Sequence, residues 1–232
     1  MTGSEKKTAD HRPRVAAQRR AAMQRRLLLA ALQVLSKRQI SDISVTDLIS
    51  QENVSRGTFY RYFDSLSQVY STLFETLAEE LAPLADLRIS RIPDPALRVA
   101  TGTRLVLHLG SSMPLFGKLM VQSGWPISLS APTFLGFLDR DIQLATAKGV
   151  FEDMPRSVAS NLIIGPMLGG LATMLRGQER PDYAEQITIR ILVSLGMGRG
   201  AAERAVEMPI PELSLPSIGL IGDILKNSAP TR

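Results

Sequence analysis

The chain has 232 residues, of which 44% are hydrophobic and 21% are charged, and it contains no cysteine. This length allows one small module and one larger helical domain, and the composition allows a buried core. The absence of cysteine excludes disulfides, thiolate catalysis and cysteine-based zinc sites. The two histidines, His11 and His108, lie far apart in the sequence.

The positive charge is concentrated at the N-terminus. Residues 1–26 contain eight of the 27 Lys and Arg residues but only two of the 22 acidic residues, so the rest of the chain carries a net charge of −1. Residues 1–13 are polar and end at Pro13, and we expect a disordered basic arm there. Such an arm suits phosphates or a minor groove, or it is a solubilising tail. We expect no signal peptide, because no apolar core follows the charged start.

Residues 14–37 are rich in good helix formers, and we expect the first helix here. Apolar residues recur on one face of this helix at Leu28, Ala31, Leu32 and Leu35. A connector follows over residues 39–44, in which Ile40 and Ile43 are expected to pack inward.

Residues 45–63, VTDLISQENVSRGTFYRYF, have the pattern of two short helices joined by a tight turn. The first helix has an apolar face at Val45, Leu48 and Ile49 and is expected to begin at the N-cap Ser44, with Asp47 three residues on. Asn53 tolerates the left-handed backbone that a turn requires, and Val54 then supplies an apolar contact between the two helices.

The second helix of this pair is expected to begin at the N-cap Ser55 and to bury Phe59 and Phe63, which are spaced i, i+4. The opposite face is rich in hydrogen-bond donors: Arg56, Gly57, Thr58, Tyr60 and Arg61. A major groove admits a helix and offers acceptors, and hydroxyls and backbone amides at a helix N-terminus suit phosphates. The pattern is therefore that of a DNA-binding helix-turn-helix. An ordinary helical hairpin with a solvated polar face is the alternative.

A fourth helix is expected after the cap at Asp64 and Ser65, ending at Pro83. Its apolar stripe comprises Val69, Tyr70, Leu73, Phe74, Leu77 and Leu81. Beyond it, helical patterns occupy residues 95–110, 112–123, 131–148, 155–177 and 181–198, separated by Pro, Gly and Ser. Because no alternation of β-branched residues is sustained, we predict an all-α chain.

Residues 28–73 resemble the N-terminal domain of the TetR family of bacterial transcriptional regulators. The resemblance rests on LLLAALQVLSKR, SVTDLISQENVSRGTFYRYF and FDSLSQVY, and VSRGTFYRYF is its most diagnostic part. Two positions differ from the family pattern. Asn53 replaces the usual turn glycine, and Leu66 stands where a phosphate-contacting lysine is common.

The resemblance implies roles for individual residues. Thr46, Ser55 and Tyr60 would contact phosphates, while Arg56, Gly57 and Thr58 would approach base edges. Arg61 and Tyr62 are further candidates for DNA contact, although Tyr62 lies beside the buried stripe and could equally pack inward.

The resemblance also implies a larger helical domain for dimerisation and ligand binding over residues 65–200, after a helix-turn-helix domain over residues 14–64. In the family, the last two helices form a four-helix dimer interface, which fits residues 155–177 and 181–198. Residues 158–175 are almost wholly apolar, but Pro166 and the glycines around it argue against a membrane span. A buried core helix without a partner is the alternative.

The family places its effector pocket among the central helices, where eight residues are candidates, each of which could instead be core: Arg104, His108, Met113, Phe116, Met120, Trp125, Phe134 and Phe137. Residues 201–232 form a C-terminal extension whose prolines rule out one continuous helix. Leu213, Leu215, Ile218, Leu220 and Ile221, with Ile224 and Leu225, make it too apolar for a free tail, so we expect it to dock on the body or on a partner subunit.

No pattern in the chain supports catalysis, a cofactor or a metal. A Walker loop, a GxSxG elbow, an HExxH helix and Cys/His clusters are all absent from the sequence, and GMGRG at 196–200 follows a helix and not a strand. We predict a cytoplasmic homodimeric repressor that binds near-palindromic double-stranded operator DNA and is released by a small-molecule effector. The alternatives are an activator, a regulator without an effector, and a helical small-molecule binding protein or enzyme that does not bind DNA.

Overall fold

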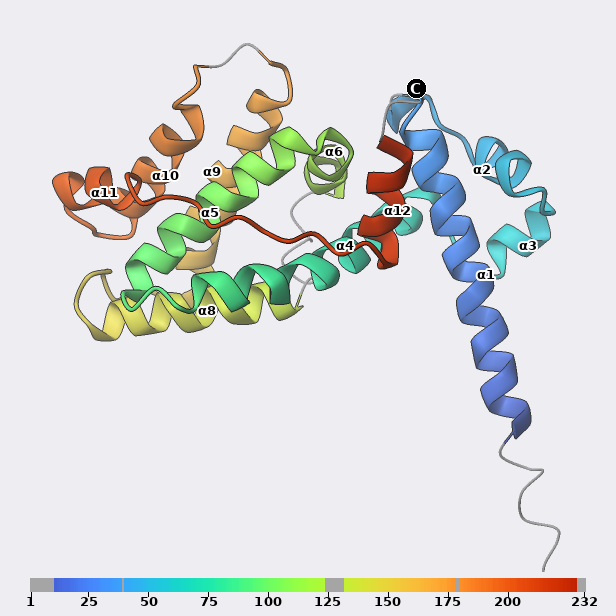
Figure 1. The fold of residues 1–232 in the computed structure, drawn as a ribbon, viewed down its shortest axis with the longest axis horizontal. Helices are drawn as coiled ribbons and strands as arrows, with labels where there is room; N and C mark the ends of the chain where they lie inside the picture. Colours follow the sequence, from blue (N-terminus) through green and yellow to red (C-terminus); the bar gives the residue numbers. More distant parts are fainter. Residues whose placement is uncertain (1–10, 39, 124–131, 178–179, 229–232) are drawn as a thin grey trace, which may run out of the picture. The chain divides into compact units, whose positions relative to one another are not determined.

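The computed structural model describes residues 11–38, 40–123, 132–177 and 180–228, which form helices and turns without a β-strand (Figure 1). The all-α prediction is therefore confirmed. The chain divides into two compact units. The first unit comprises the residues up to Val69 and those from Lys226 on. Residues 70–225 form the second unit. The domain boundaries expected at residues 13, 64 and 200 stay predictions.

The first unit comprises one long helix followed in the chain by three short elements. They are α1 (His11–Leu35), the 3-10 helix η1 (Ile40–Asp42), α2 (Val45–Glu52) and α3 (Arg56–Tyr60). α2 packs against both α1 and α3. The predicted apolar face of α1 is buried, and so are three side chains of the motif: Leu48, Phe59 and Phe63. The core of this unit is therefore the one that the apolar spacing predicted.

α1 begins three residues earlier than the sequence analysis predicted, at His11 and not at Arg14. Pro13 does not delay the start, because proline is tolerated in the first turn of a helix, where its missing N–H would have no partner. The helix ends at Leu35, two residues before the predicted end. Residues 1–10 of the expected disordered arm lie outside the described residues.

α4 (Leu66–Ile89) begins where predicted but continues past Pro83. Its predicted cap is present, since the Ser65 hydroxyl accepts a hydrogen bond from the backbone N–H of Gln68 at 3.2 Å. A proline inside a helix costs ~3 kcal/mol. Side chains on both sides of this proline are nevertheless buried, namely Leu81, Ala82 and Ile89. The prediction that the helix ends at Pro83 is wrong, because this packing offsets the lost backbone hydrogen bond.

The second unit contains the remaining helices. They are α5 (Pro95–Ser112), α6 (Pro114–Ser123), α8 (Pro132–Ala147), α9 (Arg156–Met174), α10 (Tyr183–Ser194) and α11 (Arg199–Ala205). The first four lie within three residues of the helices predicted at 95–110, 112–123, 131–148 and 155–177. α5 is the centre of this unit, since α6, α8, α9 and α10 all pack against it (Figure 1).

The helix predicted over 181–198 is interrupted, so that α10 ends at Ser194 and α11 follows as a separate element. Gly196 has a φ of 97°, in the left-handed region that favours glycine and ends helices. A Cβ at this position would lie 2.4 Å from the Glu152 side chain, so glycine is also required sterically. This break was not predicted from the sequence, because the apolar spacing continues through it.

α9 is the apolar helix that the sequence analysis considered as a membrane span. Among the described residues it is the one helix whose length and composition would allow it to cross a membrane, and a core helix of a soluble protein passes the same test. In the second unit it packs against α5, α6 and α10.

Residues 206–218 contain no helix and form an extended segment, here called the C-terminal strap. It runs from α11 to α12 (Gly219–Ser228) (Figure 1). The guanidinium of Arg104 on α5 donates a hydrogen bond of 2.6 Å to the backbone carbonyl of Met208 in the strap. Ile218 is exposed, whereas Leu220 and Ile221 are fully buried.

The start of α12 is fixed by a side chain of α4. The Glu80 carboxylate accepts hydrogen bonds from the backbone N–H groups of Leu220 at 2.9 Å and Ile221 at 3.0 Å. A carboxylate there also complements the positive end of the helix dipole. Gly219 precedes them with a φ of 81°, and a Cβ on it would lie 2.6 Å from the carboxylate oxygens. The close approach of Glu80 therefore depends on glycine at this position.

We expect Glu80→Ala to release the start of α12, because two backbone N–H groups lose their acceptor. A helix cap contributes about 1–2 kcal/mol, which corresponds to roughly 5- to 30-fold faster hydrogen exchange at Leu220 and Ile221. The measurement is amide exchange by mass spectrometry. Glu212→Ala, in the exposed part of the strap, is the matched control, and equal exchange in the two variants would contradict the role of Glu80.

Candidate nucleic-acid interface and ligand cavity

The start of α2 is held by a reciprocal cap between Ser44 and Asp47. The Ser44 hydroxyl accepts from the Asp47 backbone N–H at 3.3 Å, and the Asp47 carboxylate accepts from the Ser44 backbone N–H at 2.8 Å. The Ser44 hydroxyl and backbone N–H lower the pKa of Asp47, and the guanidinium of Arg38, 2.7 Å away, adds to the effect. This cap presents Thr46 in the first turn, where it is exposed.

The turn has the geometry that the sequence predicted. Asn53 adopts φ 54° and ψ 49°, the left-handed conformation. Ser55 then caps α3, because its hydroxyl accepts from the Thr58 backbone N–H at 3.1 Å and contacts the Thr58 hydroxyl at 2.9 Å. Val54 is half-buried between these caps. The helix pair is therefore fixed by short-range hydrogen bonds.

α3 separates its buried and exposed side chains clearly. Phe59 packs on Phe63 with ring centroids 6.0 Å apart, and both are buried. Tyr60 is 48% exposed, with its ring set edge-on to Phe59. Four predicted DNA-contacting residues of α3 and its ends are exposed, namely Ser55, Arg56, Gly57 and Arg61, and Thr58 is half-buried. Contact between these residues and DNA stays a prediction.

Tyr62 is half-buried and lies beneath an arginine of α1. The guanidinium carbon of Arg20 is 5.8 Å from the centre of the Tyr62 ring, within the range of a cation–π contact. A second arginine of α1, Arg26, forms an ion pair with Glu52 at the end of α2. α1 therefore brings basic side chains onto the helix-turn-helix itself, a contact that spacing within the motif could not reveal.

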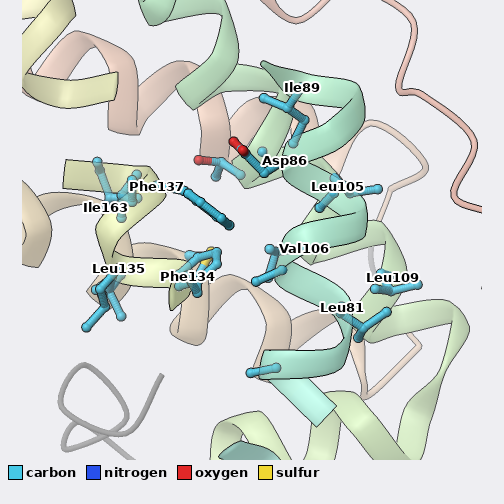
Figure 2. Close-up of a pocket in the computed structure, with 18 of the residues that line it drawn as sticks. Leu81, Asp86, Ile89, Leu105, Val106, Leu109, Phe134, Leu135, Phe137 and Ile163 are labelled. Carbon is cyan, nitrogen blue, oxygen red and sulfur yellow. The ribbon is translucent and has the colours of Figure 1, made fainter. Parts of the chain in front are cut away.

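A largely apolar cavity of about 120 Å³ lies within the second unit. α4, α5, α6, α8, α9 and Leu213 of the C-terminal strap contribute to its wall. In Figure 2, Phe137 lies near the centre of the view, and Asp86 borders the same space. Side chains from several helices surround them, including Leu81, Ile89, Leu105, Val106, Leu109, Phe134, Leu135 and Ile163.

The structure brings together four of the eight residues proposed from the sequence as ligand contacts. Phe116, Met120, Phe134 and Phe137 line the cavity. Arg104, His108 and Met113 are not among its lining residues, and Trp125 lies outside the described residues. Ligand contact stays a prediction for the lining residues.

Arg104 and His108 instead form a polar cluster with Glu185 of α10. The Glu185 carboxylate oxygen Oε1 lies 3.1 Å from Nε and Nη2 of Arg104 and 3.0 Å from Nε2 of His108. Burial raises the pKa of Glu185, but hydrogen bonds from His108, the backbone and Arg104 outweigh it, so the pKa is lowered. Because Arg104 also binds Met208, this cluster joins α5, α10 and the C-terminal strap.

The sequence analysis missed the charged groups of the cavity wall, which are Asp86, Arg98 and Asp141. Asp141 is only 5% exposed, and its Oδ1 accepts from Arg98 Nη1 at 3.2 Å and from Arg140 Nε at 2.9 Å. Arg140 Nη2 donates to Asp141 Oδ2 at 3.0 Å and to Asp86 Oδ1 at 2.8 Å. Hydrogen bonds to Asp141 and then Asp86 raise the pKa of Arg140 above its ordinary value.

A buried charge is costly unless it is paired, so an aspartate on the apolar side of a helix signals such a cluster. Asp141 lies between Leu138 and Ile142 of α8, which was the one sequence signal available. Among the described residues, no group of three or more His, Cys, Asp or Glu side chains could hold a metal ion.

Known proteins share this arrangement of helices. The crystal structure of RolR in complex with its ligand resorcinol matches with a TM-score of 0.74 and 22% identity, covering 85% of this chain and 100% of RolR. A putative TetR family transcription regulator from Shewanella sp. PV-4 matches with a TM-score of 0.59 and 19% identity, over 75% of this chain and 96% of that one. The chain has the fold of the TetR family.

Sequence comparison points to the same family of regulators. The HTH-type transcriptional regulator EthR of Mycolicibacterium smegmatis is 27% identical over 141 residues. The match covers 59% of this chain and 63% of EthR, so the chain spans less than two thirds of that relative. No model of a protein family matches the chain. The TetR-family resemblance drawn from residues 28–73 is confirmed.

The left-handed turn of the TetR-type motif can be tested at Asn53. We expect Asn53→Ala to lower the free energy of unfolding by about 1–2 kcal/mol, because a Cβ without a compensating polar group is strained at positive φ. Asn53→Gly should leave stability within about 1 kcal/mol of the wild type, since glycine accepts this backbone. Urea unfolding followed by circular dichroism measures both variants. Equal stability of the two would show that the turn imposes no left-handed requirement.

Proposed function

We propose that this protein is a DNA-binding transcriptional regulator, most simply a repressor, that binds its operator as a homodimer in the cytoplasm. The observation that carries the proposal is α3. This helix is capped by Ser55 and buries Phe59, while Arg56, Tyr60 and Arg61 remain exposed. A helix that exposes donors at its N-terminal end suits the acceptors of a major groove and its flanking phosphates.

The proposed contacts divide by chemistry. Arg56 has the fork of donors that binds guanine edges, and Gly57 lets the backbone approach closely. Thr58 presents a hydroxyl to bases, although this hydroxyl also shares a hydrogen bond with the Ser55 hydroxyl. The hydroxyls of Thr46, Ser55 and Tyr60 suit phosphates, and the arginines of α1 add sequence-independent attraction.

The surface of α9 supports the proposed dimer. Its solvent-facing stripe is mostly apolar or small. It includes Val158, Pro166 and Gly169, with half-buried Leu162 and Gly165 between them, and Asn161 is the polar side chain exposed among these residues. Such a stripe suits close packing against another helix, and α10 lies beside it with Val193 exposed. A two-fold dimer would present two copies of α3 to half-sites about 34–36 Å apart on a near-palindromic operator.

The cavity of the second unit is the proposed effector site. A concave, mostly apolar space with a few polar groups is the usual form of a small-molecule site. RolR, whose helices are arranged similarly, binds resorcinol, which supports an effector of comparable size. Binding that favours the geometry unable to bind DNA would release the operator by a shift of population. We propose no catalytic activity and no cofactor.

DNA binding is tested by fluorescence anisotropy with the DNA flanking the protein's own gene, over a range of salt concentrations. We expect Arg56→Ala to weaken binding by about 10- to 100-fold, since a bidentate base contact contributes about 1–3 kcal/mol. Tyr60→Phe removes one hydroxyl and should weaken binding by about fivefold.

Lys148→Ala is the matched control for charge, because Lys148 is exposed and lies in the second unit. It should bind DNA like the wild type. If the wild-type protein shows no DNA affinity at low salt, the regulator hypothesis is wrong and a helical ligand-binding protein or enzyme remains.

The dimer interface is tested with Gly169→Glu, measured by analytical ultracentrifugation. A Cβ at Gly169 would meet nothing within 4 Å in the protomer, so the fold should tolerate the change while a partner helix would not. We expect a shift from dimer to monomer. Gly136→Glu on α8 is the matched control, because that glycine also has open space around it. Dissociation in both variants, or in neither, would contradict an interface at α9.

A further inference from the structure

The chemistry of the cavity wall restricts the ligands that it can hold. Its charged lining residues are Asp86, Arg98 and Asp141. The one hydroxyl among the lining residues, that of Thr103, already donates to the Val99 carbonyl at 2.8 Å. Among the described lining residues, a ligand that enters this space therefore finds apolar side chains except at Thr103 and at one charged cluster.

This cluster has no net charge. Arg140, which is not among the lining residues, adds a second guanidinium group. The cluster therefore contains two carboxylates paired with two guanidinium groups. An anionic ligand would approach Asp86 and Asp141 at close range, and like charges there are unfavourable. A cationic ligand would lose its hydration without gaining an unpaired counter-charge, which is costly in an apolar site. The cavity therefore favours an uncharged ligand.

The carboxylates nevertheless keep hydrogen-bonding capacity. A carboxylate offers about four acceptor sites and cannot donate. Asp141 accepts from Arg98 once and from Arg140 twice, and among the described residues Asp86 accepts from Arg140 alone, at 2.8 and 3.4 Å. Because Arg140 Nη2 bonds to both residues, their free acceptor sites lie close together. Groups that match them are hydrogen-bond donors, and a hydroxyl group supplies such a donor without adding charge to the ligand.

The size and the walls define the rest of the ligand. A cavity of about 120 Å³ is close to the roughly 150 Å³ of an engineered apolar cavity that holds benzene. Aromatic side chains line it, with Phe74 and Phe116 stacked at 6.0 Å and Phe134 and Phe137 on α8. These dimensions suit a single six-membered aromatic ring.

We propose that the effector is an uncharged single-ring phenol, whose hydroxyl groups donate hydrogen bonds to Asp86 and Asp141. The inference rests on the proposed effector role of the cavity and assigns two residues, on α4 and α8, as the hydrogen-bond acceptors that select it. Phe134 and Phe137 hold the ring, and Arg98 and Arg140 keep the two carboxylates in place.

Selectivity of the wild-type protein is the first test, measured by isothermal titration calorimetry. The probes are phenol, catechol, resorcinol and hydroquinone, against 1,3-dimethoxybenzene, benzoate and benzylamine. We expect at least one phenol to bind about tenfold or more tightly than 1,3-dimethoxybenzene, which has a similar ring but no donor. The proposal is overturned if no phenol binds at 10 mM, or if a probe without O–H groups binds as tightly as the best phenol.

The second test uses Asp86→Asn and Asp141→Asn, with Asp139→Asn, an aspartate of α8 that is not among the cavity-lining residues, as the matched control. Each cavity variant should weaken phenol binding by about tenfold while leaving 1,3-dimethoxybenzene unchanged. The comparison of the two probes within one variant separates loss of an acceptor from damage to the fold. Phenol affinity equal to that of the control would overturn the assignment of that residue.

Failure of this proposal can be told apart from failure of the proposed function. A protein that binds its operator but no phenol refutes only the ligand class. A protein that binds phenols through Asp86 and Asp141 but has no DNA affinity refutes only the regulator.

Discussion

The buried carboxylate of Asp141 is the constraint on which the second unit depends. Removing one partner of a buried ion pair costs about 3–5 kcal/mol, because the remaining charge loses its compensation. Arg98 and Arg140 must therefore stay within hydrogen-bond distance of Asp141, and Arg140 also binds Asp86. These bonds fix α8 against α4 and α5. Asp86, Arg98 and Asp141 form one part of the cavity wall, and the other lining residues are mostly apolar.

A second set of polar contacts involves Arg104, further along α5, and Glu80 of α4. Arg104 joins Glu185 of α10 to the Met208 carbonyl of the C-terminal strap, and Glu80 of α4 caps α12 where the strap ends. Leu213 lies between these two anchors in the chain and contributes to the cavity wall. The C-terminal extension thus contributes to the cavity wall, and its position is set by hydrogen bonds to two different helices.

The sequence predicted the helix-turn-helix closely because its geometry is decided locally. The caps at Ser44 and Ser55 act over three residues, and the left-handed turn needs only Asn53. The cavity could be predicted only in part. Phe116, Phe134 and Phe137 of its aromatic wall were predicted from the resemblance, which places a pocket among the central helices, whereas Asp86 and Asp141 are brought together from distant positions by packing. The continuation of α4 past Pro83 was missed for the same reason.

The position of Asp86 on α4 matters for regulation under the proposed function. Asp86 is on α4, the helix that begins beside the motif at Leu66 and runs unbroken to Ile89, so a ligand bound to Asp86 contacts the helix that enters the first unit. Under the proposed function, a ligand shifts the DNA-binding equilibrium only by its difference in affinity between two arrangements of that helix. The Arg140 bridge between Asp86 and Asp141 depends on the position of α4 relative to α8. An O–H donor that bonds to both carboxylates is therefore sensitive to that position, whereas a ligand held by apolar contacts alone is less so.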